Sequence, residues 1–200
     1  MKQRFFLFIP FITLILFLSG CGTTVGNDLA GAYNMTQCKY AYNSISDLSV
    51  SGVNLTSKAS LTPLNLVKLT NVLTGNATSI PVNFTVHMDV TNPNQSAAML
   101  SRLQYEISID EIHFTNGTLD QAVNIAPGGT QTLPLTIGVD VATLMQNNSQ
   151  TALLNIVKNI AGISGEKSTV SVSLRPTFNI AGQLVTSPIA IPVSFSFGGK

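Results

Sequence analysis

Strict alternation of apolar and polar residues is the feature that most constrains the fold of this chain. The clearest case is residues 82–90, where valine, phenylalanine and methionine alternate with polar residues. Successive side chains of a β-strand point to opposite faces of the sheet, so this spacing predicts a strand with one buried face. The same pattern recurs in residues 103–109, 133–141, 170–174 and 189–197. One-sided burial is typical of antiparallel sheets, and the chain is therefore predicted to be all-β.

Turn-forming residues separate these strands. The predicted turns and loops are Asn92-Pro93-Asn94, Asn116-Gly117 and Pro127-Gly128-Gly129. Asn, Gly and Pro favour the backbone conformations that tight turns need, and Asn94 in particular tolerates a left-handed one. Weaker strand signals run through residues 40–55, 119–125 and 177–184. This number and spacing of strands predicts two packed antiparallel sheets.

The apolar phase slips at Asp110-Glu111. Ile109 and Ile112 are three residues apart, so an unbroken strand would place them on opposite faces. A turn or bulge at this point would keep both on the inner face.

Two segments have helical spacing instead. Residues 62–75 begin with Thr-Pro, which suits an N-cap and a first helical turn, and end in glycine, which suits a C-terminal stop. Residues 149–161 carry apolar residues on one helical face, and a glycine follows. We expect both helices to be short insertions that cover a sheet edge or an end of the sandwich.

The first 20 residues have the layout of a secretory signal. Lys2 and Arg4 precede the apolar run Phe5–Leu18. This run is interrupted by proline and is shorter than the roughly 20 residues that a membrane-spanning helix needs. The sequence from Leu18 to Cys21, Leu-Ser-Gly-Cys, resembles the lipobox of bacterial lipoproteins. An ordinary signal peptide with an incidental cysteine, or a short hydrophobic anchor, is the alternative interpretation.

The lipobox resemblance predicts cleavage between Gly20 and Cys21, with lipid on the new N-terminal cysteine. Two or more acyl chains would hold the protein stably on a membrane. Residues 21–37 are predicted to be the lipidated N-terminus and a flexible tether, because residues 22–28 are small and polar. Position 22 is glycine and not aspartate, and resemblance to enterobacterial sorting rules then favours the outer membrane, with the protein facing the periplasm.

Composition limits the class of protein. Residues 38–200 are enough for one domain with a proper core. Charged residues make up only 10% of the chain, and no basic run occurs, so nucleic acid is not an expected partner. If Cys21 is acylated, Cys38 has no cysteine to pair with, and we predict a buried or half-buried thiol.

The order of turn motifs resembles a known family. An alternating strand that ends in Asn92-Pro93-Asn94, a hairpin entered through residues 97–105, and Pro127-Gly128-Gly129 before another alternating strand are similar to the type-2 late embryogenesis abundant domain. This domain is also called the water-stress and hypersensitive-response domain. The resemblance covers residues 40–197, and the two predicted helices depart from the pattern.

The resemblance implies a fibronectin-III/immunoglobulin-like antiparallel β-sandwich without known catalytic residues. The family is associated with water stress and desiccation, and a lipid-holding groove between the sheets has been suggested for some relatives. On this basis the two turn motifs are markers of the fold and not catalytic groups.

Residues with reactive or metal-binding side chains are few and scattered. His87 and His113 lie on different predicted strands, without a carboxylate or thiol at metal-ligand spacing. Asp110, Glu111 and Asp120 lack the dense oxygen-ligand loop of calcium sites, so a solvated hairpin is the favoured interpretation. The segment from Gly162 to Gly165 only approaches a nucleophile-elbow motif. We predict no metal, no cofactor and no enzyme activity.

Three functions follow as hypotheses. The favoured one is a non-catalytic, membrane-anchored lipoprotein that acts in envelope stress protection or protein interaction, with an unknown partner and as a monomer. The alternative is a module of the periplasm that binds or transfers lipid or another hydrophobic ligand. A hydrolase or metalloenzyme ranks last, because it would need a convergent triad or a bound metal.

Overall fold

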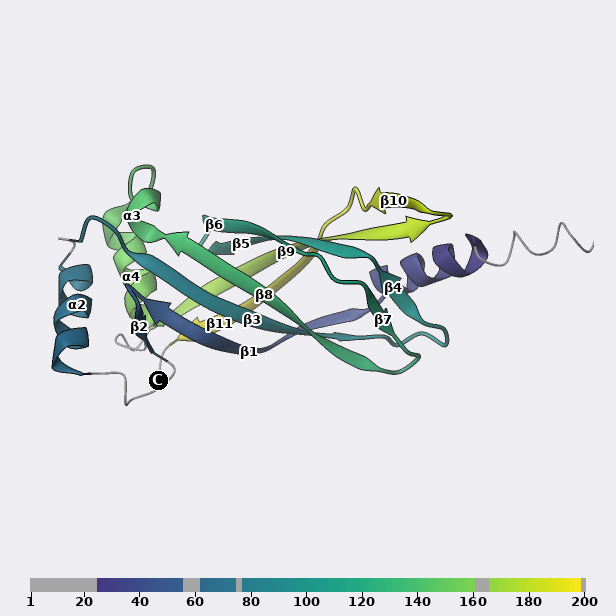
Figure 1. Cartoon of the computed structure of the whole chain (residues 1–200), viewed down its shortest axis with the longest axis horizontal. Helices are drawn as coiled ribbons and strands as arrows, with labels where there is room; N and C mark the ends of the chain where they lie inside the picture. The colour runs from purple at the N-terminus through teal and green to yellow at the C-terminus, as the bar shows by residue number, and fades with distance from the viewer. Residues whose placement is uncertain (1–24, 56–61, 75–76, 161–165, 199–200) are drawn as a thin grey trace, which may run out of the picture.

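The computed structural model describes residues 25–55, 62–74, 77–160 and 166–198. Two antiparallel sheets form an elongated body with helices at its ends (Figure 1). The strands of the first sheet lie in the order β2-β1-β3-β8. Their bounds are Val53–Asn54 for β2, Lys39–Val50 for β1, Pro81–Thr91 for β3 and Thr130–Asp140 for β8.

The second sheet is built around the long strand β9 (Lys167–Ile180), with β5 (Arg102–Ile109) on one side and β6 (Ile112–Leu119) beyond it. On its other side, the first part of β9 pairs with β11 (Ile191–Gly198), and the last part of β9 pairs with β10 (Gln183–Thr186). The short strands β4 (Ala98–Leu100) and β7 (Val123–Ile125) form a separate two-stranded sheet. The predicted all-β sandwich with short helices is therefore confirmed.

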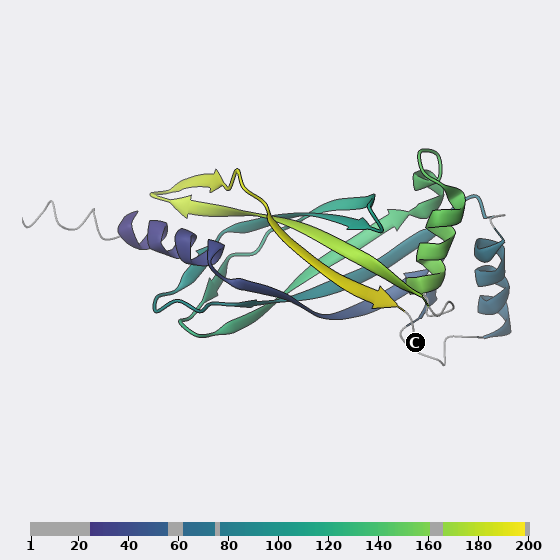
Figure 2. The same ribbon diagram turned by 180° about the vertical axis from the view of Figure 1, so that it is seen from behind.

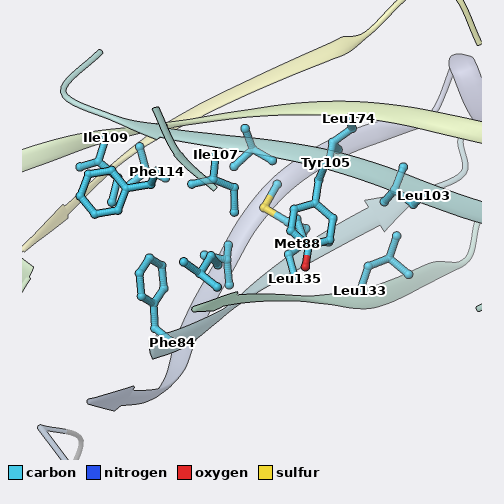
Figure 3. Packing of buried hydrophobic residues seen from close by; sticks show 14 of the residues in the cluster. Phe84, Met88, Leu103, Tyr105, Ile107, Ile109, Phe114, Leu133, Leu135 and Leu174 are labelled. Atoms are coloured by element: carbon cyan, nitrogen blue, oxygen red, sulfur yellow. The ribbon is translucent and has the colours of Figure 1, made fainter. Parts of the chain in front are cut away.

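The core fills the space between the two sheets. Phe84 and Met88 of β3 face Tyr105 and Ile107 of β5, as Figure 3 shows, and all four side chains are buried. The inward residues of each predicted ladder alternate with outward ones, as expected from the period of two. Two boundaries differ from the prediction: β8 ends at Asp140, and Ile189 is exposed ahead of β11.

Two aromatic residues link the two main sheets. The ring of Tyr42 on β1 stacks on Phe195 of β11, with centroids 4.2 Å apart. Tyr105 lies on β5, an interior strand of the second sheet, and its hydroxyl donates a hydrogen bond of 2.7 Å across the core to the carbonyl oxygen of Thr136 on β8.

The predicted phase break at Asp110-Glu111 is a tight turn between β5 and β6. Both residues are left-handed, with φ of 48° and 67°, a conformation that costs energy for residues other than glycine. The Asp110 carboxylate accepts a 2.8 Å hydrogen bond from the Thr169 N–H, and the Asp110 N–H donates to the Thr169 carbonyl. These bonds to β9 offset the cost of the turn.

The interpretation of Asn116-Gly117 as a turn is wrong, because both residues lie inside β6. Gly117 is the direct partner of Tyr105 across the β5–β6 pair. A methyl group at position 117 would overlap the Tyr105 ring. The glycine therefore makes room for an aromatic side chain and does not reverse the chain direction.

The predicted helices are confirmed. α2 (Pro63–Leu73) begins after Thr62, whose hydroxyl accepts a hydrogen bond from the Asn65 N–H as its N-cap. Its C-cap is Thr74, and the predicted stop at residue 75 lies outside the described residues. α4 (Gln150–Ile160) packs against β9 and β11, and the short α3 (Val141–Leu144) precedes it. All three lie at one end of the sandwich (Figure 1).

Asp140 fastens α3 to the start of β3. Its carboxylate accepts hydrogen bonds from the Ser79 hydroxyl (2.6 Å) and the Ile80 N–H (2.7 Å), and it caps α3 through the Ala142 N–H (3.0 Å). Burial raises the pKa of this carboxyl, but the three hydrogen bonds together lower it below its ordinary value. The charged form is therefore favoured in the folded protein.

Stability should consequently fall in acid. Because the folded-state pKa of Asp140 is the lower one, its stabilisation is present above the unfolded pKa of about 3.9 and is lost as pH falls through the folded pKa. We expect Asp140→Asn to be less stable than wild type at pH 7 and to approach it at pH 3. Urea unfolding of both proteins at the two pH values measures this. A constant difference would contradict the assignment.

Residues 25–36 form a helix, so the predicted flexible tether over residues 21–37 is wrong for this part. Ala32 and Met35 are buried against the sandwich, and the chain passes directly from the helix into β1. Residues 21–24 and the predicted secretory signal lie outside the described residues. None of the helices within the described part of the chain is both long and apolar enough to span a membrane.

Candidate functional site at the end beside helix 25–36

Asn92 is the centre of a hydrogen-bond network at one end of the sandwich. Its side chain is completely buried. The amide nitrogen donates to the carbonyl oxygens of Ser96 (2.9 Å), Ile125 (3.0 Å) and Ala126 (3.3 Å). The amide oxygen accepts hydrogen bonds from the backbone and side-chain nitrogens of Asn94, at 3.0 and 2.9 Å. One side chain therefore joins the loop after β3 to the loop after β7.

The two predicted fold markers lie side by side. The Asn92 N–H donates to the Gly129 carbonyl, and the Gly128 N–H donates to the Asn92 carbonyl, both at 2.9 Å. Gly128 has a φ of 69°, which an L-residue rarely adopts, so the glycine is needed for this close pairing. Pro93 directly follows Asn92, and Pro127 directly precedes Gly128. The two motifs thus act as a single unit.

Asn94 contributes its side chain to this unit. The backbone of Asn94 is not left-handed, so tolerance of a left-handed conformation does not explain why asparagine occupies this position. Its amide nitrogen instead donates to the carbonyl oxygen of Asn34 in helix 25–36, at 3.2 Å. The Asn34 side chain donates in return to the Ser96 hydroxyl (2.6 Å) and the Ala97 carbonyl (2.9 Å). The asparagine network therefore holds the end of the helix on the sandwich.

Further contacts fix both ends of helix 25–36. Near its start, the Asp28 carboxylate accepts a 3.1 Å hydrogen bond from the Ala181 N–H in the β9–β10 turn. Near its end, the Tyr40 hydroxyl donates to the Met35 carbonyl at 2.9 Å. In the middle, Gly31 packs so closely against Met99 that a methyl group there would overlap the methionine. The helix is thus an integral part of the domain.

A hollow of about 290 Å³ lies next to this helix. Its lining combines apolar side chains, including Met99, Val123 and Phe178, with Asp28 and Asn179. This volume is just below the range for small-molecule sites, which is roughly 300–1,000 Å³. The hollow lies outside the space between the two main sheets.

Cys38 is a buried free thiol, as predicted. Its Sγ donates to the Asn34 carbonyl at 3.3 Å, and burial raises the pKa of the thiol. A raised pKa disfavours the reactive thiolate, so this cysteine is suited to packing and not to nucleophilic attack.

The histidines and carboxylates considered as site residues are far apart in the fold. His87 contacts the Ser46 hydroxyl at 2.9 Å, while His113 pairs with Glu106 at 3.2 Å on the exposed face of another sheet. Among the described residues, no group of three or more His, Cys, Asp or Glu side chains could hold a metal ion.

The carboxylates considered for calcium are also separated. Asp110 and Glu111 form the turn before β6, whereas Asp120 follows the other end of β6 and pairs with Arg102. The interpretation as a solvated hairpin therefore fits the structure. The near-motif at residues 162–165 and the predicted lipidation residue Cys21 lie outside the described residues.

The fold and the network define a class of protein, an antiparallel β-sandwich whose paired turn motifs hold a helix at one end. The chain belongs to the late embryogenesis abundant protein family (LEA_2), whose sequence model matches residues 87–196, more than half of the chain. The matched region contains Asn92, Asn94 and Gly128-Gly129, but not helix 25–36. The LEA_2 domain is associated with stress, and the family is generally non-enzymatic.

Several solved structures are similar to this chain. A protein from Archaeoglobus fulgidus has 15% identity and a TM-score of 0.36, over 82% of this chain and 95% of that one. A protein from Arabidopsis thaliana has 11% identity and a TM-score of 0.43, over 80% and 83%. A solution structure described as a late embryogenesis abundant (LEA) protein has 11% identity and a TM-score of 0.40, over 94% and 86%. No curated protein sequence matches the chain.

Proposed function

We propose that this chain is a lipoprotein of the cell envelope, anchored through Cys21, whose LEA_2 sandwich is a non-catalytic body in stress protection or protein interaction. The proposed location is the outer membrane, with the sandwich in the periplasm. Support for the anchor comes from the signal-like layout of residues 1–20 and from Cys21 directly after them. The protein would act as a monomer, without a metal or cofactor.

The observation that carries this proposal is the attachment of helix 25–36 to the sandwich. Cys21 precedes Val25 by four residues, which span at most roughly 14 Å when fully extended. Because Asn34 and Asp28 hold the helix on the domain, a lipid on Cys21 would keep the sandwich itself close to the membrane. A rigid body at a membrane surface suits a protective or scaffolding role.

Substitution of the lipidated cysteine tests the anchor. We expect Cys21→Ala to abolish metabolic labelling with an alkyne fatty acid and to move the protein from the detergent phase to the soluble fraction. Cys38→Ala is the matched control, because the other cysteine is buried and should leave labelling unchanged. Membrane retention of Cys21→Ala would favour the hydrophobic-anchor alternative.

A strain without the protein tests the stress role. We expect lower survival after drying, restored by the wild-type chain and less well by Cys21→Ala, because protection would depend on position at the membrane. Survival equal to that of the parent strain would contradict stress protection and leave protein interaction as the role of the sandwich.

A second candidate function is binding of a lipid or another hydrophobic ligand. The hollow beside Met99, Val123 and Phe178 favours it, since those side chains offer apolar contact beside helix 25–36. The space between the main sheets is instead occupied by buried side chains (Figure 3). Organic extraction of the purified protein, followed by mass spectrometry, should release a non-covalent lipid if this function is correct. Ser101→Trp, which narrows the hollow, should reduce its amount.

A further inference from the structure

Large apolar side chains are exposed at the end of the sandwich that carries helix 25–36. Leu29 and Tyr33 are four residues apart and share one face of the helix, and Tyr33 is 65% exposed. Leu184, 62% exposed, and Val185 are neighbours on β10, so both faces of the β9–β10 hairpin carry an exposed apolar side chain. Figures 1 and 2 both place the β9–β10 hairpin beside the helix, where Asp28 bonds to Ala181.

The same end is almost free of charge. It is formed by helix 25–36, the segment 92–101 with β4, the segment 121–131 with β7, and the β9–β10 hairpin with its exit, residues 176–190. Among all these residues Asp28 is the only charged one, and its carboxylate is engaged by the Ala181 N–H. Transfer of this surface into a less polar environment therefore desolvates few ions. Charged residues border these segments, with Lys39 at the start of β1 and Arg102 paired to Asp120, and others lie in the β5–β6 turn and at the start of β9.

We propose that this end is a membrane-seating surface, with Leu29, Tyr33, Leu184 and Val185 in the headgroup region of the lipid layer that holds Cys21. The proposal rests on the lipid anchor proposed above. Apolar side chains enter the interface when they bury area there, and tyrosine is enriched at this depth.

The reach of the chain supports lipid as the occupant. The first described residue of the helix, Val25, follows Cys21 by four residues, so their backbones lie within roughly 14 Å of each other. The headgroup region adds about 5–8 Å to each side of the hydrocarbon core. The tip of the helix and the adjacent hairpin can therefore contact lipid while Cys21 is inserted. A protein partner or a second copy of the chain would not need to lie beside the anchor.

Tryptophan fluorescence can test this contact, because the natural chain contains no tryptophan. We would introduce Leu184→Trp at the proposed surface and Leu64→Trp on α2 as the matched control. Leu64 is 68% exposed and lies at the opposite end of the sandwich (Figure 1). The mature lipoprotein would be reconstituted into phosphatidylcholine–phosphatidylglycerol vesicles with or without bromine atoms near the top of the acyl chains.

We expect strong quenching by brominated lipid and a blue-shifted emission for Leu184→Trp, and neither change for Leu64→Trp. Leu29→Trp should behave like Leu184→Trp and provides a second probe. Unquenched fluorescence in protein that floats with the vesicles would overturn the seating surface but not the anchor. Failure to float would contradict the anchor itself. A blue shift without quenching, together with a dimer on light scattering, would assign the surface to a second copy and overturn the proposal.

Discussion

Replacement of Asn92 with alanine should lower the free energy of unfolding by about 3–5 kcal/mol. The side chain is completely buried and donates to three backbone carbonyl groups. Without it, the Ile125 carbonyl loses a buried partner, and Asn94 loses the acceptor that orients its side chain toward Asn34. Urea denaturation followed by circular dichroism measures the loss.

Asn92→Asp separates hydrogen bonding from side-chain volume. This change keeps the shape but replaces the donating nitrogen with an oxygen that would face the same carbonyls, so we expect destabilisation at least as large as that of Asn92→Ala. Asn124→Ala, at an exposed position of the neighbouring β7, is the control and should change stability by less than about 0.5 kcal/mol. Equal stability of the wild type and Asn92→Ala would contradict the role of the network.

Gly117→Ala should destabilise the domain by about 2–3 kcal/mol, because the added methyl group would overlap the Tyr105 ring. The ring cannot move away without loss of its hydrogen bond to Thr136, which links the two sheets. Thermal unfolding of the variant measures the effect. This destabilisation is larger than expected for a glycine-to-alanine substitution in a strand, which is ordinarily tolerated.

A double-mutant cycle identifies the cause. In a Tyr105→Leu background the ring is absent, so Gly117→Ala should cost much less than in the wild type. Tyr105→Phe keeps the ring and removes the hydroxyl, and it should cost about 1 kcal/mol on its own. If Gly117→Ala is equally costly with and without the ring, backbone conformation and not the Tyr105 contact explains the glycine.

The sandwich itself could be predicted from sequence because burial on one face of a strand leaves a local trace. In residues 82–90 each inward residue is apolar and each outward one is polar, and the structure confirms this pattern in β3. The turn at Asp110-Glu111 was also predictable, since the slip between Ile109 and Ile112 is visible without knowledge of the partner strand. Both signals depend only on neighbouring residues.

The features that could not be predicted from the sequence depend on contacts with residues far away in the chain. Asn116-Gly117 has the composition of a hairpin turn, but the side chain of Tyr105 on the adjacent strand determines why glycine is present. Helix 25–36 contains two glycines and has a weak local preference for helix, and contacts such as Asn34 with Ala97 hold it in place. Long-range contacts therefore determine the structure both at Asn116-Gly117 and in helix 25–36.

The candidate site was predicted only in part. Asn92 and Gly128-Gly129 were recognisable as fold markers, but Asn92 and its partner Ile125 are 33 residues apart, and their contact leaves no local pattern. Asn34 was missed for the same reason. The available signal was that Asn92 continues the inward series of Val86, Met88 and Val90, so a polar side chain is expected at a core position where it needs hydrogen-bond partners.

The identity of the N-terminal residue in native membranes tests the central claim most directly. Mass spectrometry of the N-terminal peptide should find a chain that begins at Cys21, with acyl groups on both the sulfur and the new amino group. An unmodified Cys21, or a chain that still carries residues 1–20, would contradict the lipid anchor.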